Sequence, residues 1–274
     1  MARYTRTEGI CLRRIDYSNT SQVATFLTPD GGRLPFMCKG IKRSPKKGIS
    51  RGLELGARYS LVFFKSRRSS LYTLTDHSML ESYRGARQAI ERILCVYYAV
   101  ELMRSFTSEG DPCSELYGLL ADSLGRFSRG ECLGLSVLFL ELGVLQDYGS
   151  LPTFDACAEC GRDLRENGRL TFSAFHGGPL CRPCSREIHH PRGSTIPVRA
   201  RRLRILASLC SHPTGRLHEI SLPPKEIVAA SRLVRFHMRY LMGKEFTMWK
   251  YLHGRHLSRS LRRIRRRCEH TGQD

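Results

Sequence analysis

The sequence has 274 residues, of which 41% are hydrophobic and 26% are charged. A chain of this length and composition supports about two packed domains and excludes wholesale disorder. Lys and Arg number 45 against 25 Asp and Glu, which gives a formal net charge of +20. Such a charge favours nucleic acid as the partner, with an anionic membrane surface as the second choice.

Membrane insertion and secretion are not expected. The longest apolar run, Leu133 to Leu142, is interrupted by Glu141 and is shorter than the roughly 20 residues that a spanning helix needs. No apolar stretch follows the first arginines, so the sequence predicts a cytoplasmic protein without a secretory signal. The 11 cysteines are therefore interpreted as thiols or metal ligands rather than as disulfides.

The positive charge lies at the two ends of the chain. Residues 1–76 carry a net charge of +10, residues 77–198 a net charge of −3, and residues 199–274 a net charge of +13. This distribution is typical of two segments that face nucleic acid around a nearly neutral scaffold, although solvated faces and a disordered basic tail would look similar.

The first zone is predicted to be a small β-barrel. Turn residues such as Pro29-Asp30-Gly31-Gly32 separate five short runs of alternating apolar residues, near 9–15, 22–28, 33–41, 59–65 and 69–76. Leu34, Phe36 and Cys38 fall on one alternate face. The five-stranded OB-fold is the favoured architecture for such a pattern, and an SH3-like barrel has a similar length.

Helices are predicted for most of the remaining chain. Apolar residues at three-to-four spacing indicate a long amphipathic helix from Leu80 to Val100, and a second helix follows Asp111-Pro112. A third, near 131–146, is apolar nearly all round and is expected to be buried. Two more are expected over 201–210 and 224–243, the latter with Pro in its first turn and Gly at its end.

A paired cysteine motif gives the most specific chemical signal. Cys157 and Cys160 form one C-x2-C pair, and Cys181 and Cys184 form a second pair after an intervening stretch of 20 residues. Two such knuckles supply four thiolates at the corners of a tetrahedron, which is typical of a closed structural zinc site. An iron–sulfur cluster, a metal-free remnant and substitution of one ligand by His176 are the weaker alternatives.

Cations cluster in three places outside this motif. The first cluster lies in a loop after the third strand and is interrupted by Gly and Pro, which suits contacts with the backbone of a single strand. It comprises Lys39, Lys42, Arg43, Lys46, Lys47 and Arg51. Arg232, Arg235 and Arg239 share one face of a predicted helix, which fits either a phosphate groove or a solvated surface. The segment 258–267 holds six arginines and is expected to be unstructured in isolation.

Aromatic residues beside the cationic loop are candidates for base stacking. Strand alternation places Phe63 and Phe64 on opposite faces, so one of them is expected to be exposed. Tyr97 and Tyr98 are better explained as core residues of their helix. The sequence has no P-loop motif and no G-x-S-x-G elbow, and no nucleophile is paired with a base, so a non-enzymatic protein is predicted.

The order of these motifs resembles the RecO family of bacterial DNA repair and recombination mediators. The resemblance rests on Glu8 to Arg13, Asp16-Tyr17, Thr25 to Thr28, and Gly32 to Arg43, together with the helical middle and the Cys-x-x-Cys-Gly segment at 157–161. It covers roughly residues 6–250. The arginine-dense tail departs from the family pattern.

The resemblance implies a multi-domain α+β protein. Its parts would be an OB-fold over 1–78, a helical domain over 79–152 and 193–257, a zinc-binding insertion over 153–192, and a disordered tail over 258–274. It implies binding of single- and double-stranded DNA, annealing of complementary strands, and loading of RecA, together with RecR, onto DNA coated by single-strand-binding protein. The acidic C-terminal tail of that protein would bind the helical domain, and one zinc ion would be structural.

Within this resemblance, Lys39, Lys42 and Arg43 would contact DNA. The main alternative is a zinc-ribbon transcription factor or RNA-associated factor with an OB-like barrel. An enzyme with an unrecognised site on the helical domain is the least favoured possibility.

Overall fold

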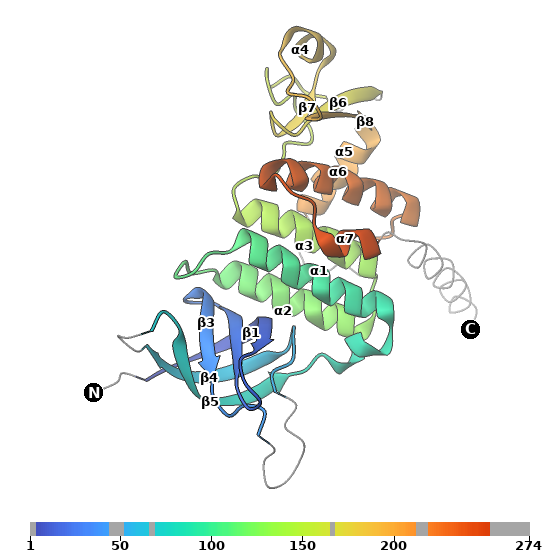
Figure 1. The fold of residues 1–274 in the computed structure, drawn as a ribbon. Helices are drawn as coiled ribbons and strands as arrows, with labels where there is room; N and C mark the ends of the chain where they lie inside the picture. Colours follow the sequence, from blue (N-terminus) through green and yellow to red (C-terminus); the bar gives the residue numbers. More distant parts are fainter. Residues whose placement is uncertain (1–3, 44–51, 66–68, 165–167, 212–218, 253–274) are drawn as a thin grey trace, which may run out of the picture. The chain divides into compact units, whose positions relative to one another are not determined.

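The computed structural model describes residues 4–43, 52–65, 69–164, 168–211 and 219–252. The chain divides into two compact units, residues 1–131 and residues 132–274 (Figure 1). Among the described residues, no helix has both the length and the hydropathy that crossing a membrane requires.

The first unit begins with a closed five-stranded barrel. Its strands are β1 (Thr5–Asp16), β2 (Gln22–Thr28), β3 (Gly32–Cys38), β4 (Arg58–Lys65) and β5 (Tyr72–Glu81). They pair in the order β1-β2-β3-β5-β4, and β4 returns to β1 to close the barrel. The β3–β5 pairing is parallel and the other pairings are antiparallel. The predicted OB-fold is therefore confirmed.

Strand alternation fills the barrel with aromatic side chains. Leu34, Phe36 and Cys38 are buried on one face of β3, as predicted. Phe36 packs edge-on against Phe26 and Phe63, with ring centroids 5.5 and 5.1 Å apart. Such edge-to-face pairs are stabilising beyond the apolar area that they bury, so they help to hold the barrel closed.

Three helical segments follow the barrel in the first unit: η1 (Arg84–Gln88), α1 (Ile90–Phe106) and α2 (Ser114–Arg129). The prediction of a helix from Leu80 was wrong at its start, because β5 continues to Glu81 and pairs with β4. Tyr83 then adopts a left-handed conformation at φ 49°, which separates the strand from the helical turn. Tyr98 is fully buried, whereas Tyr97 is 42% exposed. The prediction that both tyrosines are core residues is therefore confirmed for Tyr98 and wrong for Tyr97.

Apart from the short helix α4 (Arg182–Glu187), the described part of the second unit contains four helices: α3 (Leu133–Asp147), α5 (Ala200–Cys210), α6 (Pro224–Met242) and α7 (Thr247–Leu252). The prediction that α3 is buried is confirmed, since Leu138, Leu140 and Val144 are each 0% exposed. It packs mainly against α6. Pro224 begins α6 and Gly243, at φ +63°, ends it, as predicted.

A small sheet completes the second unit. Its strands are β6 (Arg169–Ser173), β7 (Gly178–Leu180) and β8 (Thr195–Arg199), in the order β7-β6-β8. The short helix α4 (Arg182–Glu187) follows β7, and β8 leads directly into α5. The sheet therefore connects the cysteine-containing segment to the helices.

Candidate functional site

The four cysteines of the paired motif meet in one cluster. The sulfur atoms of Cys157, Cys160, Cys181 and Cys184 all lie within 4.8 Å of one another. The Sγ atoms of Cys160 and Cys181 are 3.7 Å apart. A tetrahedral zinc site with bonds of about 2.3 Å has sulfur–sulfur edges of about 3.8 Å. The cluster therefore has the dimensions that a metal bound by four thiolates requires.

Local backbone geometry brings the two pairs together. The Gly161 amide donates to the Cys157 carbonyl at 2.9 Å, and Gly161 takes the left-handed conformation, at φ +71°, that closes this first turn. The second pair lies at the start of α4, where the Ser185 amide donates to the Cys181 carbonyl at 2.9 Å. The Ala158 amide donates to the Pro179 carbonyl of β7 at 2.8 Å and so joins the first turn to the sheet.

The cluster favours a thiolate at Cys157. Burial raises the pKa of this thiol, but hydrogen bonds from the backbone amides of Cys160, Cys181 and Glu159 outweigh burial and lower the pKa to about 6. The Cys181 amide, for example, lies 3.4 Å from the Cys157 sulfur. Hydrogen bonding to the neighbouring Cys181 thiol is the main cause of a raised pKa at Cys184. Four sulfur donors at these distances are the ligand type that binds a soft cation.

His176 does not belong to the cluster. Its Nδ1 atom lies 2.9 Å from the Ser173 hydroxyl, and its Nε2 atom lies 3.8 Å from a carboxylate oxygen of Glu159. The alternative in which His176 replaces a cysteine ligand is therefore not supported.

The first predicted cation cluster lies in the turn after β3. Lys39 and Arg43 are exposed, whereas the Lys42 ammonium pairs with the Asp16 carboxylate at 2.9 Å. The turn and part of β5 line a cavity of about 400 Å³, to which Leu74 to His77 contribute. Lys46, Lys47 and Arg51 lie outside the described residues, as does the arginine-dense tail. Two exposed cations thus lie beside a hollow on the barrel surface.

The predicted arginine face of α6 requires a correction. Arg232 is exposed, and Arg239 is half exposed and pairs with Glu245 at 3.5 Å. Arg235 is only 6% exposed, because it forms an ion pair with the fully buried Glu141 of α3 and lies over the ring of Trp249. The interpretation of Arg235 as a DNA contact was therefore wrong. It is a core residue of the second unit.

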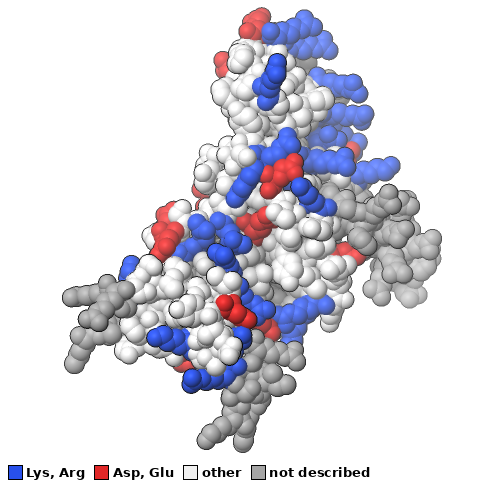
Figure 2. Space-filling view, in the orientation of Figure 1, with Lys and Arg blue, Asp and Glu red and all other residues white. Residues whose placement is uncertain are grey.

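Another group of cations was not singled out in the sequence. Arg199 and Arg169 are exposed and directly opposite each other in the β6–β8 register. Arg201 and Arg204 continue the exposed positive charge along α5. Figure 2 shows Lys and Arg side chains gathered along one side of the second unit, at the level of β8 and α5. The close spacing of the arginines at positions 199, 201, 202 and 204 is the sequence signal that could have identified this group.

A groove lies beside this group on the second unit. Its volume is about 400 Å³, and it combines apolar side chains with two guanidinium groups. It is lined by Arg201, Arg204, Ile205, Ser208, Leu209, Ile220 and Leu222. Arg201 also lies 4.0 Å from the Glu226 carboxylate.

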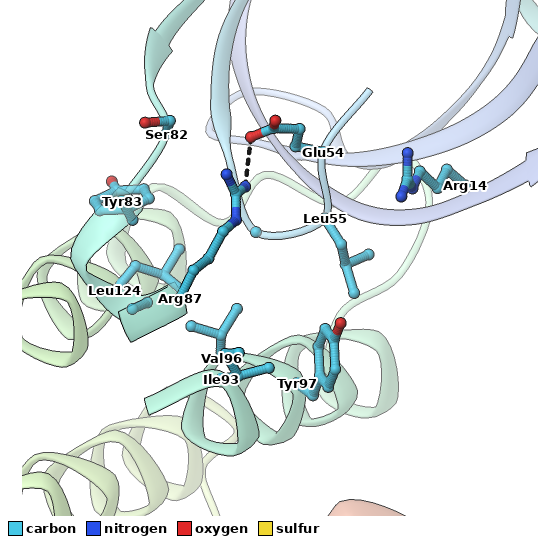
Figure 3. Close-up of a pocket in the computed structure, with 12 residues that line it drawn as sticks. Arg14, Glu54, Leu55, Ser82, Tyr83, Arg87, Ile93, Val96, Tyr97 and Leu124 are labelled. Atoms are coloured by element: carbon cyan, nitrogen blue, oxygen red, sulfur yellow. Dashed lines mark hydrogen bonds and ion pairs between the residues drawn. The ribbon is translucent and has the colours of Figure 1, made fainter. Parts of the chain in front are cut away.

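A further cavity, of about 390 Å³, lies where the barrel meets η1 and α1 (Figure 3). Its apolar wall includes Val96 and Leu124, and an ion pair between Arg87 and Glu54 lies at its polar side. The Tyr97 ring projects toward the Leu55 side of the cavity. Among the predicted DNA contacts that the structure describes, none lines this cavity.

Comparison with known proteins gives one consistent result. A family model described as "Recombination protein O N terminal" matches residues 1–83, and one described as "Recombination protein O C terminal" matches residues 87–250. The DNA repair protein RecO of Anaeromyxobacter sp. (strain K) is 32% identical over 244 residues, which cover 89% of this chain and 94% of the relative. The DNA repair protein RecO of Rhodopirellula baltica is 31% identical over 223 residues, covering 81% of this chain and 78% of the relative.

Proposed function

Because the chain belongs to the RecO family of DNA repair proteins, we propose that it is a non-enzymatic mediator of homologous recombination. It binds single- and double-stranded DNA and anneals complementary strands, and it helps to load RecA onto DNA coated by single-strand-binding protein. Such a mediator works in the bacterial cytoplasm, at the nucleoid. The family assignment favours this role over that of a zinc-ribbon transcription or RNA-associated factor.

The observation that carries the proposal is the cationic turn on the OB barrel. Lys39 and Arg43 are exposed beside a cavity, and the Lys46, Lys47 and Arg51 cations follow in the sequence. Annealing requires that phosphates be neutralised while base edges stay open for pairing. Lysine and arginine side chains in a turn meet this requirement, because they contact the backbone without reading the bases.

A second DNA surface is supported by the arginines of β6, β8 and α5. Like charges directly opposite each other on a sheet are destabilising, and Arg169 opposite Arg199 has this arrangement. A phosphate bound between them would relieve the repulsion. Arg232 and Arg239 of α6 remain candidate contacts, since both are exposed. Each unit of the protein would then hold its own strand.

The four-cysteine cluster would hold one structural zinc ion. All four positions of a tetrahedral site would be occupied by thiolates, so no position would remain for a substrate. The metal would fix the two knuckles against β7 and thereby stabilise the small sheet. The sequence motif, the sulfur distances and the lowered pKa of Cys157 support this assignment.

Protein partners are also part of the proposal. The α5 groove combines Arg201 and Arg204 with apolar side chains, which suits the acidic C-terminal tail of single-strand-binding protein. RecR is the expected partner in loading RecA.

The experiment that tests the proposal is annealing of two complementary oligonucleotides without any nucleotide cofactor, at low and at moderate salt. Lys39→Ser/Arg43→Ser should weaken both strand binding and annealing. The log–log salt dependence of binding should fall by about 1.4, since each phosphate contact on a single strand contributes about 0.7. Arg84→Ser/Arg104→Ser removes two exposed cations from the same unit and is the matched control. Unchanged annealing in the Lys39/Arg43 variant would contradict the proposal.

A further inference from the structure

The cavity between the barrel and α1 combines the features of a site for one flat, polar-edged group (Figure 3). Its volume of about 390 Å³ falls in the range of small-ligand pockets. Ile93, Val96 and Leu124 form an apolar wall, and Leu55 adds to it from the barrel side. Tyr97 is 42% exposed and can present its aromatic ring to a ligand, whereas Tyr98, the next residue of α1, is fully buried.

The polar side of the cavity presents both hydrogen-bond donors and acceptors. The Arg87 guanidinium pairs with the Glu54 carboxylate across it, and Arg14 lies at the opposite side (Figure 3). Ser82 and Tyr83 also line the cavity, but their hydroxyl groups point away from it in Figure 3. The edge of a nucleobase carries donors and acceptors side by side, so a rim with both kinds of group complements it.

The backbone around the cavity is already held in position. Gly56 has φ +75°, and a Cβ atom there would come within 2.7 Å of Val96, so the barrel loop lies directly on α1. The Arg14 guanidinium donates to the Leu53 carbonyl. Tyr83 has φ 49°, a left-handed conformation that is costly for a residue with a side chain. A pocket with fixed walls binds its ligand at a lower entropic cost.

A chain of hydrogen bonds links this cavity to the cationic turn. The Lys42 ammonium contacts Asp16 at 2.9 Å, and the Gln22 amide group donates to Asp16 at 3.0 Å. The Gln22 carbonyl oxygen in turn accepts a hydrogen bond from the Leu53 amide at 3.0 Å. Leu53 directly precedes Glu54 and Leu55 in the cavity wall. The cationic turn and the cavity wall are therefore joined by one hydrogen-bonded network.

We propose that this cavity binds one unpaired base of a single DNA strand, stacked on Tyr97 and hydrogen-bonded to Glu54 and Arg87. The proposal rests on the DNA-binding function proposed above and names a subsite of it. Holding one base out of the stack anchors the strand at a single point. The other bases keep their edges free to pair with a complementary strand.

The test compares two probes on the full-length protein. One is a short labelled oligothymidylate, and the other is a strand of the same length and charge in which abasic residues replace every nucleoside. Tyr97→Ala removes the ring at an exposed position, and Tyr97→Phe keeps the ring without its hydroxyl. Tyr148→Ala, at a tyrosine that is 54% exposed in the second unit, is the control.

Tyr97→Ala should weaken binding of the oligothymidylate about tenfold, within the range for loss of one stacked base, and leave the abasic strand unaffected. The salt dependence should not change, because no phosphate contact is removed. Tyr97→Phe and Tyr148→Ala should bind as the wild type does.

Equal binding of the oligothymidylate by the wild type and Tyr97→Ala would overturn the subsite while leaving the proposed function intact. If that variant also loses affinity for an acidic, apolar-ended peptide, the cavity would be assigned to a protein partner. A wild-type protein that binds neither strand at low salt would overturn the proposed function and the subsite together.

Discussion

The buried ion pair between Arg235 and Glu141 allows a sharp test of how the second unit is held together. Arg235 is 6% exposed and Glu141 is 0% exposed, and the guanidinium also lies over the ring of Trp249. Glu141→Gln removes the negative charge with little change in shape. It removes the negative charge that faces the buried Arg235 guanidinium, and Arg235 cannot lose its proton in response.

The expected cost follows from burial. Removing one partner of a buried pair typically destabilises by about 3–5 kcal/mol, whereas an exposed pair contributes about 0–1 kcal/mol. The Arg129–Glu131 pair, with side chains 61% and 52% exposed, belongs to the second class. With a urea dependence of about 2 kcal/mol per molar, Glu141→Gln should lower the unfolding midpoint by about 2 M. Glu131→Gln should shift it by less than about 0.5 M.

Urea unfolding followed by tryptophan fluorescence is the appropriate assay. Trp249 is the single tryptophan of the sequence and lies against Arg235, so its emission reports on this packing. A double variant, Glu141→Leu/Arg235→Met, removes both charges and fills the space with apolar groups. It should recover most of the lost stability, since replacing a buried pair by apolar residues is often neutral or stabilising.

Two results would refute this account of the Arg235–Glu141 pair. Equal midpoints for Glu141→Gln and Glu131→Gln would show that the Arg235–Glu141 pair contributes no more than an exposed pair. A double variant that is less stable than Glu141→Gln would show that the loss comes from packing and not from an unpaired buried charge.

Three further predictions concern other parts of the chain. Cys184→Ser should reduce the zinc content, measured by atomic absorption, well below one ion per chain, whereas Cys132→Ser, at an exposed cysteine outside the cluster, should not. Gly110→Ala, at φ +77° with no atom within 4 Å, should destabilise by about 1–2 kcal/mol in thermal unfolding because of its φ alone. Gly56→Ala, at φ +75°, should destabilise by more, because the added Cβ atom would also lie 2.7 Å from Val96. Burial lowers the pKa of His237 below its ordinary value of 6.5, so the folded protein favours the neutral imidazole. As the pH falls below 6.5, the unfolded chain takes up a proton at His237 more readily than the folded protein does, and stability is lost. The stability measured from pH 7 to pH 5 should therefore decline less steeply in His237→Gln than in the wild type.

Local sequence patterns predicted the barrel well because a strand exposes alternate residues to one environment. The buried face of β3 at Leu34, Phe36 and Cys38 follows directly from this alternation. The end of β5 could not be predicted in the same way. Leu80 is 43% exposed and fits a helical spacing with the residues that follow it, but pairing between β4 and β5 holds it in a strand. The partner strand is a tertiary feature that the spacing does not contain.

The cysteine cluster and the arginine face show the same contrast. The ligands within each C-x2-C pair are close in sequence, so the spacing already indicates a knuckle, and the structure brings the two pairs together. The spacing of Arg232, Arg235 and Arg239 correctly places them near one side of α6. Whether such a side faces solvent depends on what packs against it. Glu141, which pairs with Arg235, is 94 residues away and belongs to another helix.

This distinction bears on how the surface charge relates to function. A net charge of +20 counts every arginine equally, but Arg235 is neutralised inside the second unit and Lys42 is paired with Asp16. Among the described residues, Lys39 and Arg43 remain exposed on the barrel of the first unit, and Arg169 and Arg199 remain exposed on the small sheet of the second unit. In the proposed annealing role, each of these surfaces would neutralise the phosphates of one strand while its base edges stay open. If both surfaces are required, removing the cations of either one should slow annealing more than it weakens binding of a single strand, whereas removing the cations of one shared surface would reduce both in proportion.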